Sequence, residues 1–207
     1  MKKLLTLSLA ALLAAALAGC SDFGLSAKPV IYLYPEEETE VTVSLDFDGT
    51  LTSTYPDYGE GWTVTAAPDG TLTDPDTGRT YYCLFWEGVT DAEYDFSTGF
   101  CVAGADTAAF LENALARLGL TEREANEFII YWLPRMEGNP YNLISFQTDA
   151  YTDAAELTIA PAPDTLIRVF MAWKGLDQPV EVRPPELPAP ARTGFPAVEW
   201  GGGELGK

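Results

Sequence analysis

The residues that could do chemistry in this chain are carboxylates, tyrosines, lysines and cysteines, because its 207 residues include no histidine. Histidine is the commonest general base at neutral pH and the commonest zinc ligand in proteins. Its absence excludes the Ser-His-Asp and Cys-His arrangements that activate a serine or cysteine nucleophile. Any catalysis would therefore depend on carboxylates, Tyr, Lys or a hard metal ion.

The carboxylates with the most suggestive spacing are Asp46 and Asp48, in the run Leu-Asp-Phe-Asp-Gly-Thr-Leu at 45–51. This run resembles the first motif of the haloacid-dehalogenase phosphohydrolases, in which a strand ends in Asp-x-Asp-Gly-Thr. The resemblance implies that Asp46 attacks phosphorus as the nucleophile, that Asp48 protonates the leaving group, and that Mg²⁺ binds between them. A metal-dependent phosphohydrolase is therefore the alternative function for this chain.

Three features of the sequence favour a turn over this enzyme site. That family's strand is central in a parallel sheet and continuously apolar, whereas Thr42 and Ser44 interrupt this one. The family also needs a following helix, a lysine and a later acidic pair, but no lysine occurs between residues 28 and 174. Asp-Gly between alternating segments is typical of a β-hairpin, and Asp-Gly-Thr-Leu-Thr occurs at both 48–52 and 69–73. We therefore expect two successive hairpins.

A second acidic pattern, Asp74-x-Asp76-x-Gly78, looks like half of a calcium-binding loop. It lacks the third acidic ligand and the glutamate that ends such a loop. A turn is the preferred interpretation, and we expect neither a metal site nor a cofactor.

Two groups of aromatic and charged residues could bind a ligand. Trp86 and Glu87 end an expected strand. The second group flanks an expected turn at 138–140 and consists of Trp132, Arg135, Glu137 and Tyr141. Aromatic faces beside a few polar groups suit a sugar or a peptide, but Trp and Tyr on strands also serve as core residues or cross-strand pairs. Both interpretations stay open, and Arg135 could simply pair with Glu137.

The N-terminus predicts a lipid anchor. Lysines at 2–3 precede an apolar run at 4–17, which is too short to span a membrane and is typical of a signal peptide. The sequence Leu-Ala-Gly-Cys at 17–20 resembles a bacterial lipobox. The resemblance implies cleavage after Gly19 and acylation of Cys20, with ordinary signal cleavage as the alternative. The mature protein would then sit on the extracytoplasmic face of a bacterial cell membrane, held there by its acyl chains.

Cys83 and Cys101 are the cysteines that remain if Cys20 carries lipid. An even pair outside the cytoplasm is typical of a disulfide, and closing a loop of this length would stabilise the fold by roughly 3 kcal/mol. We therefore predict a disulfide between Cys83 and Cys101, joining the strand before Trp86 to the segment that enters the first helix. Two buried thiols are the alternative.

Composition sets the class of protein and its partners. The formal net charge is −19, from 12 basic and 31 acidic residues, and such an acidic surface disfavours nucleic acid as a partner. The length suits one domain that is large enough to bury its own core. We expect a signal peptide at 1–19, a tether at 20–28, the domain at 29–183, and a Pro- and Gly-rich segment at 184–207 with a mobile end.

Hydrophobic periodicity predicts an α+β fold, mostly antiparallel β-sheet made of successive hairpins, with two short helices inserted in the second half. Asp106 would cap the first helix and Gly119 would end it, while Thr121 and Glu124 form a capping box for the second. The run 128–133 has helical spacing but strongly β-forming residues, and we predict a buried strand there after a helix that ends near 127. Other strands are expected at 28–35, 41–47, 62–66, 79–86, 142–147, 156–159 and 165–173.

The run Lys-Pro-Val-Ile-Tyr-Leu-Tyr-Pro at 28–35 resembles a group of uncharacterised bacterial surface proteins and lipoproteins. The Glu-rich stretch and Val-Thr-Val strand after it, and the runs at 131–134 and 142–146, are similar to theirs as well. The resemblance covers most of the mature chain and implies an extracytoplasmic location, but it brings no known activity. We therefore expect a lipid-anchored surface protein with a non-catalytic binding or interaction domain, whose partner is an unknown protein, peptide or glycan.

Overall fold

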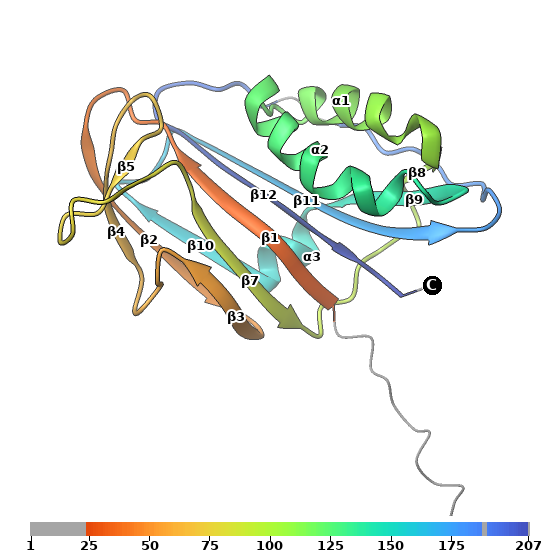
Figure 1. Ribbon diagram of the computed structural model, residues 1–207, viewed down its shortest axis with the longest axis horizontal. Coiled ribbons are helices and arrows are strands. Elements are labelled where there is room, and N and C mark those ends of the chain that lie inside the picture. Colours follow the sequence, from red (N-terminus) through yellow and green to blue (C-terminus); the bar gives the residue numbers. More distant parts are fainter. Residues whose placement is uncertain (1–23, 188–189, 207) are drawn as a thin grey trace, which may run out of the picture.

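The computed structural model describes residues 24–187 and 190–206. Within them the chain forms an α+β fold of mainly antiparallel strands in two sheets, with helices over one face (Figure 1). This confirms the coarser part of the prediction, an α+β class with mostly antiparallel sheet, whereas the predicted signal peptide and Cys20 lie outside the described residues. None of the described helices is both long enough and apolar enough to cross a membrane.

The larger sheet does not follow the order of the chain. From edge to edge it runs β3 (Thr50–Tyr55), β7 (Leu84–Thr90), β1 (Gly24–Leu33), β12 (Pro196–Glu204), β11 (Thr165–Leu176), β9 (Tyr141–Gln147) and β8 (Phe100–Ala103). The neighbours β11 and β12 are parallel, and their outer partners β9 and β1 are antiparallel to them. The connection at 177–195 therefore returns along the length of the sheet before β12 begins.

The smaller sheet stacks on one face of the larger one. Its order is β10 (Ala155–Ala160), β2 (Thr39–Phe47), β4 (Trp62–Ala66), β5 (Leu72–Thr73) and β6 (Thr80–Tyr81). On β2 the residues Val41, Val43 and Leu45 are buried between the sheets, and the residues between them are exposed. The alternation that the sequence predicted for this strand is therefore confirmed.

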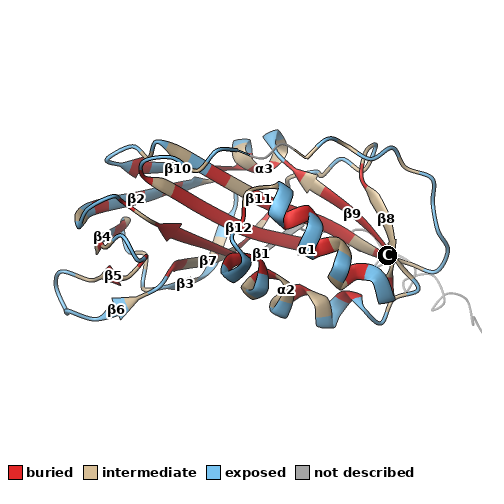
Figure 2. Cartoon of the chain, turned by 90° about the horizontal axis from the view of Figure 1, so that it is seen from above, coloured by how far each residue is buried: buried red, intermediate tan, exposed pale blue. Residues whose placement is uncertain are grey.

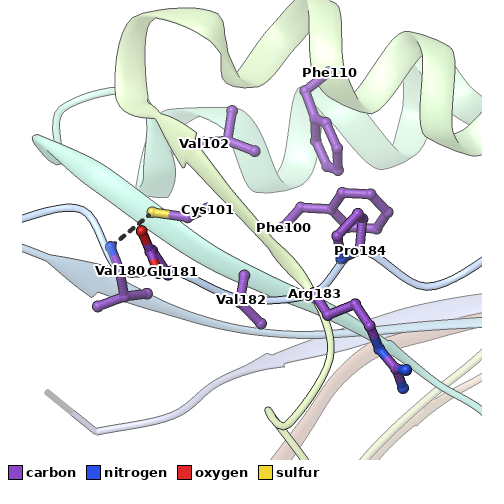
Figure 3. A pocket seen from close by; sticks show the side chains of 10 residues that line it. Phe100, Cys101, Val102, Phe110, Val180, Glu181, Val182, Arg183 and Pro184 are labelled. Atoms are coloured by element: carbon purple, nitrogen blue, oxygen red, sulfur yellow. Dashed lines mark hydrogen bonds between the residues drawn. The ribbon is translucent and has the colours of Figure 1, made fainter.

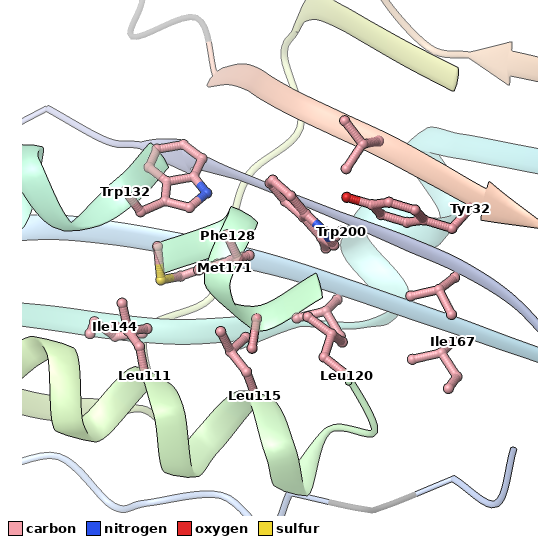
Figure 4. Close-up of a cluster of buried hydrophobic side chains, with 14 of the residues drawn as sticks. Tyr32, Leu111, Leu115, Leu120, Phe128, Trp132, Ile144, Ile167, Met171 and Trp200 are labelled. Atoms are coloured by element: carbon pink, nitrogen blue, oxygen red, sulfur yellow. The ribbon is translucent and has the colours of Figure 1, made fainter. Parts of the chain in front are cut away.

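Strand β1 contributes to two cores because its side chains alternate. Ile31 and Leu33 are fully buried between the two sheets, whereas Val30 and Tyr32 pack on the other face under the helices (Figure 4). Successive side chains on a strand point to opposite faces, so a strand covered on both faces needs large apolar residues at consecutive positions. Figure 2 shows buried residues along the central strands and exposed residues on the outer faces of the helices.

The helices on that face begin at the predicted signals, but only the first α-helix also ends where predicted. They are η1 (Gly104–Asp106), α1 (Thr107–Arg117) and α2 (Glu122–Met136), while the short α3 (Asp149–Ala154) joins β9 to β10. Asp106 occupies the N-cap of α1 but makes no side-chain capping bond. Gly119 follows α1 with a φ of 90°, and the capping box of Thr121 and Glu124 is present at α2.

The strand predicted at 128–133 is wrong, because α2 continues through it to Met136. Phe128 and Trp132 lie one turn apart on the same helix face, and both are buried against the larger sheet. Fully burying a side chain of this size contributes about 1.5–3 kcal/mol, which exceeds the few tenths of a kcal/mol by which β-forming residues disfavour a helix. Tertiary packing therefore overrides local propensity.

The prediction for the C-terminal segment is also wrong, since most of its Gly-rich end belongs to a β-strand. Residues 196–204 form β12, which lies between β1 and β11 near the middle of the larger sheet. A Cβ atom on Gly202 would lie 2.6 Å from the carbonyl oxygen of Met171 and 2.8 Å from the ring of Trp132. Glycine therefore allows α2 to approach the sheet closely, and the domain continues past the predicted boundary at 183.

Of the two predicted Asp-Gly hairpins, one is confirmed and one is wrong. Asp69-Gly70 connects the antiparallel strands β4 and β5, with Gly70 at a φ of 86°. Asp48-Gly49 instead leads from β2 in the smaller sheet to β3 in the larger sheet, and these two strands do not pair. Strand β2 pairs with β10 along 42–47. On its other edge it pairs with β4 at 39–43, and the Tyr58 hydroxyl bonds the backbone N–H and carbonyl of Leu45, so that edge is not free for β3.

The predicted disulfide is wrong as well, because Cys83 and Cys101 are free. Cys83 directly precedes β7 near one edge of the larger sheet, and Cys101 lies in β8 at the opposite edge. Neighbouring strands are about 4.8 Å apart, so the strands between them put the two cysteines on the order of 24 Å apart. A disulfide tolerates a Cα separation of no more than about 7 Å.

Candidate functional site

Three tyrosines form an aromatic surface at the end of β1. Tyr32 lies in β1 and Tyr34 just after it, so both side chains point to the helix-covered face of the sheet. Their rings are parallel within 3°, with centroids 6.3 Å apart. Tyr82, which precedes β7, lies 6.4 Å from Tyr32 at 42° and is 51% exposed. The alternation of a strand and the nearby β6–β7 connection thus bring three phenol rings together.

These rings line two hollows, which we call together the tyrosine groove. The first has a volume of about 460 Å³, and its lining includes Tyr32, Tyr34, Tyr82, Thr71, Arg123 and Arg192. The second has a volume of about 380 Å³, and its lining includes Lys28, Tyr55, Tyr81, Tyr82 and Phe85. Tyr82 belongs to both hollows, so a ligand that lies over this ring can enter either of them.

A buried ion pair stabilises one wall of the first hollow. Glu124, in the first turn of α2, is 1% exposed, and its carboxylate accepts hydrogen bonds of 2.8 and 3.1 Å from both terminal nitrogens of Arg192. Arg192 also donates to the carbonyl of Gly119, and its guanidinium lies 5.4 Å from the ring centroid of Tyr34. Burial raises the pKa of Glu124, but the hydrogen bonds from Arg192 and the Thr121 backbone outweigh it and hold that pKa below its usual value.

The other charged groups near the tyrosines are also engaged. Tyr32 donates a 2.7 Å hydrogen bond to Glu127, and Arg123 lies 3.6 Å from the same carboxylate. Burial raises the pKa of Tyr32, and its hydrogen bond to Glu127 raises it further. Burial and the nearby charge of Glu124 raise the pKa of Tyr34 in the same way. The hydroxyl groups therefore stay protonated at physiological pH, and the Tyr32 hydroxyl, whose proton is given to Glu127, can still accept a hydrogen bond.

The opposite wall is the tip of the β4–β5 hairpin at 69–71. The backbone N–H of Thr71 donates a 2.9 Å hydrogen bond to the Asp69 carboxylate, and this bond lowers the pKa of Asp69. A Cβ atom on Gly70 would lie 2.7 Å from the ring of Tyr34. Glycine thus gives both the positive φ of the turn and the close approach that closes the groove.

A larger but open hollow of about 740 Å³ lies at the far edge of the sheet, between β8, α1 and the segment 180–184 (Figure 3). Phe100 and Phe110 face each other there with ring centroids 5.0 Å apart, and the backbone N–H of Val180 donates to the sulfur of Cys101 at 3.4 Å. Its charged residues, Glu181 and Arg183, are exposed. The tyrosine groove, with several polar groups that converge between aromatic rings, is the better candidate site.

The first predicted ligand group is not at the surface. Trp86 is fully buried between the sheets, where its indole N–H donates to the carboxylate of Glu199 at 3.1 Å. Glu199 is itself buried and receives a 2.7 Å hydrogen bond from Arg168. Glu87 is half-buried and accepts a bond from the backbone N–H of Lys28. Trp86 therefore belongs to a buried polar network, which agrees with the alternative interpretation that it is a core residue.

The second predicted group is divided between the core and the surface. Trp132 is 1% exposed and packs against Trp173. The guanidinium of Arg135 lies 4.0 Å from the ring centroid of Tyr131 and donates to the carbonyl of the same residue. Within the described part of the chain Arg135 makes no ion pair with Glu137. Glu137 is exposed, and Tyr141 is half-buried at the start of β9, so these residues form no shared cavity.

The two predicted catalytic aspartates are exposed side chains on an antiparallel strand and its end. Asp46 lies opposite Glu156 of β10, and the backbone N–H of Asp48 donates to the carbonyl of Ala154. The phosphohydrolase resemblance implies a central parallel strand, and β2 is antiparallel to both of its neighbours. In the described ranges no three acidic or cysteine residues are placed to hold a metal ion.

Sequence reasoning assigned Tyr32 and Tyr34 to a strand but did not identify them as site residues. One signal was available, since two tyrosines at positions i and i+2 must share a face of the strand. The contributions of Tyr82 and Arg192 could not have been found in this way. They come from chain segments about 50 and 160 residues further on, and only the pairing of strands and the crossover at 177–195 bring them to β1.

Comparison with known proteins identifies a bacterial relative. No family model matches this chain, and no solved structure matches it. A protein of Butyrivibrio fibrisolvens described as "Uncharacterized protein in bglA 3'region" is 46% identical over 85 residues, which cover 37% of this chain and 86% of the relative. That description states no activity for the relative. The present chain belongs to the same family as this Butyrivibrio fibrisolvens protein.

Proposed function

We propose that the protein is a lipid-anchored, extracytoplasmic surface protein of a bacterial cell membrane that binds a ligand in the tyrosine groove without transforming it. The signal-type segment at 1–19 and the lipobox-like sequence that ends at Cys20 support the location. The observation that carries the binding proposal is the convergence of Tyr32, Tyr34 and Tyr82 with Arg192 on one groove. Its hollows are within the range of about 300–1,000 Å³ that ligand pockets occupy.

The state of the charged groups supports binding over catalysis. A general base needs a free lone pair near the reacting atom and a pKa near the working pH. Glu124 gives its oxygens to Arg192, and its lowered pKa makes it a weaker base. Glu127 accepts from Tyr32 and lies beside Arg123. These carboxylates hold the walls of the groove in place, and aromatic faces supply the contact area.

The position of the groove fits an anchor at Cys20. Strand β1 begins at Gly24, four residues after that cysteine, and four residues span at most about 14 Å. The ten residues of β1 then extend by roughly 30 Å, and Tyr34 lies just beyond their far end. An anchor at the start of β1 would therefore leave the first hollow at the opposite end of the strand, directed away from the membrane, with the second hollow beside its middle.

Binding is tested with the full chain in detergent micelles and a panel of short peptides and oligosaccharides, measured by calorimetry. We expect at least one member of the panel to bind, and Tyr82→Ala to weaken that binding. Ile130→Ala is the matched control, because Ile130 is 74% exposed but lies outside both hollows. Equal affinities in the wild type and Tyr82→Ala, or no binding by any ligand, would contradict the proposal.

The anchor is tested separately with Cys20→Ala. We expect this variant to leave the membrane fraction or to remain unprocessed, because no thiol is then available for acylation. Incorporation of labelled fatty acid into the wild type is the direct measurement. Unchanged partition of the variant into the detergent phase would contradict the anchor and leave the binding proposal as it stands.

A further inference from the structure

Most charges of the tyrosine groove have partners inside the protein, while the Arg123 side chain is 74% exposed. Glu124 pairs with Arg192, and Glu127 lies beside Arg123. Asp69 accepts a hydrogen bond from a backbone N–H in its own turn. The second hollow contains Lys28, whose ammonium lies 5.2 and 5.9 Å from the ring centroids of Tyr131 and Trp200. A charged ligand would therefore compete with these internal partners, which favours a neutral ligand.

At the first hollow the backbone of β1 gives an extended peptide no free edge, whereas the edge strands β3 and β6 contribute Tyr55 and Tyr81 to the second hollow. Peptides that bind as an added strand need a free sheet edge. Strand β1, which carries Tyr32, is paired on one side with β7 and on the other with β12. The residues that line the first hollow carry polar side-chain groups, namely tyrosine and threonine hydroxyls, two guanidinium groups and the carboxylate of Asp69. Such groups match a ligand with many hydroxyl groups of its own.

The aromatic rings of the groove can contact the apolar face of such a ligand. A pyranose ring has an apolar face of C–H groups and an equatorial rim of hydroxyls, and aromatic rings suit ligands that are apolar on one side and polar on the other. Tyr82 is 51% exposed and belongs to both hollows. A chain of linked sugar rings can therefore lie over Tyr82 with rings on either side of it, which a single sugar cannot do.

We infer that the tyrosine groove binds a neutral oligosaccharide, with one pyranose face stacked on Tyr82 and its hydroxyls bonded to the tyrosine hydroxyls and to Arg123. This inference rests on the proposed binding function and names its ligand class. It makes Tyr82 the residue that contributes most to affinity through its ring face. It also predicts an affinity that is nearly independent of salt concentration, because a neutral ligand forms no ion pair that salt could screen.

The experiment uses the full chain in a detergent without a sugar headgroup, and calorimetry at low and high salt. The probes are neutral hexasaccharides of β-1,4-glucose, α-1,4-glucose, β-1,4-xylose, β-1,4-mannose and N-acetylglucosamine, with hexagalacturonate as the acidic probe and uncharged hexapeptides as the peptide probes. We expect at least one neutral hexasaccharide to bind with little dependence on salt. Tyr82→Ala should weaken that binding by about tenfold, Tyr82→Phe should retain most of it, and Ile130→Ala should leave it unchanged.

The possible failures are distinguishable. If only the peptides bind, and Tyr82→Ala abolishes their binding, the binding function stands and the oligosaccharide inference is overturned. If only hexagalacturonate binds, with an affinity that falls as salt rises, a neutral ligand is overturned. If a neutral hexasaccharide binds equally well to wild type and Tyr82→Ala, the groove is not its site. If no probe binds, both the inference and the proposed function fail.

Discussion

The pentapeptide Asp-Gly-Thr-Leu-Thr occurs twice in this chain and has two different structures. At 48–52 it carries the chain from the smaller sheet to the larger one, and at 69–73 it forms the tip of the β4–β5 hairpin. Its leucine is half-buried as Leu51 but fully buried as Leu72. The second copy lines the tyrosine groove, and the first copy does not.

The two glycines serve different physical needs. Gly70 has a φ of 86°, a conformation that residues with a Cβ atom rarely adopt. Gly49 has no positive φ, but a Cβ atom there would lie 2.3 Å from the carbonyl oxygen of Val89. The second copy therefore needs glycine for the shape of its backbone, and the first needs it because another strand passes close by.

The neighbouring strands decide between these outcomes. Where β2 enters the first copy, one edge pairs with β10 and the Tyr58 hydroxyl bonds both backbone groups of Leu45 on the other, whereas β4 enters the second copy with one edge still free for β5. A hairpin needs that free edge, and the turn-forming tendency of Asp-Gly cannot provide it. Identical local sequence thus leads to different structures because the pairing available to the preceding strand differs.

The largest expected effect on stability comes from a residue beside the tyrosine groove, and it should reach the second copy but not the first. We expect Glu124→Gln to lower the free energy of unfolding by about 3 kcal/mol, because it leaves Arg192 beside the groove without its buried partner. Chemical shifts should change around the second copy at 69–73 and stay unchanged around the first at 48–52. Glu122→Gln, on an exposed residue of the same helical turn, is the control and should change neither.

The same variant has a defined pH dependence. The pKa of Glu124 is lowered in the folded state from its usual value of 4.5, so its contribution to stability is present above that pH and is lost as the pH falls through the folded-state pKa. The difference in unfolding free energy between wild type and Glu124→Gln should therefore be constant near neutrality and shrink below pH 4.5. A difference that grows on acidification would contradict this assignment.

The next prediction tests the close approach in the first copy. We expect Gly49→Ala to cost about 2 kcal/mol, because the new methyl group overlaps a backbone oxygen that cannot move without shifting β7. The measurement is chemical denaturation. Gly138→Ala is the matched control, since a Cβ atom on Gly138 would meet nothing within 4 Å and this glycine has no positive φ. Equal costs for the two variants would show that β3 and β7 leave room for a methyl group at Gly49.

Much of the fold was predictable where a signal is local. The alternation of β2, the capping box at Thr121 and the hairpin at Asp69-Gly70 each depend on a few adjacent residues, and all three are confirmed. The errors occur where distant residues decide. Helix α2 continues through 128–133 because the sheet beneath it buries its aromatic face, and β12 lies within the larger sheet, where Gly202 fits under Trp132.

The candidate site was less predictable for the same reason. Trp86 and Trp132 were predicted to bind a ligand because aromatic faces beside polar groups suit recognition. Their size makes them equally suited to the core, where both lie. The residues that do line a groove come from β1, the β4–β5 tip, the segment before β7 and the crossover after β11. No local pattern links these segments, because their meeting depends on the strand order of both sheets.

A smaller effect is expected from the glycine of the second copy. Gly70→Ala should cost about 1 kcal/mol for the positive φ and somewhat more for the contact with the ring of Tyr34, which can rotate. Gly78→Ala measures the cost of the positive φ alone, since Gly78 has a φ of 69° and open space around it. Ligand binding should weaken in Gly70→Ala and stay unchanged in both Gly78→Ala and Gly49→Ala. Weaker binding in Gly49→Ala would show that the two copies are coupled.

The smallest effect, a change in a labelling rate, shows whether disturbance of the second copy stays local. Cys83 lies shortly after the β5–β6 hairpin that follows this copy, it is buried, and burial raises the pKa of its thiol to about 12. Cys101, at the far edge of the larger sheet, is half-buried. In a Cys20→Ala background we expect both thiols to react with iodoacetamide, with Cys83 much the slower, because it must wait for a local opening.

Gly70→Ala should speed the reaction of Cys83 and leave that of Cys101 unchanged, because the opening that exposes Cys83 lies beside the disturbed hairpin. Mass spectrometry of the labelled peptides over time measures both rates in the same sample, so Cys101 serves as the internal control. Equal acceleration of both thiols would mean that Gly70→Ala promotes opening of the whole domain. The disturbance would then not be confined to the hairpin at the second copy.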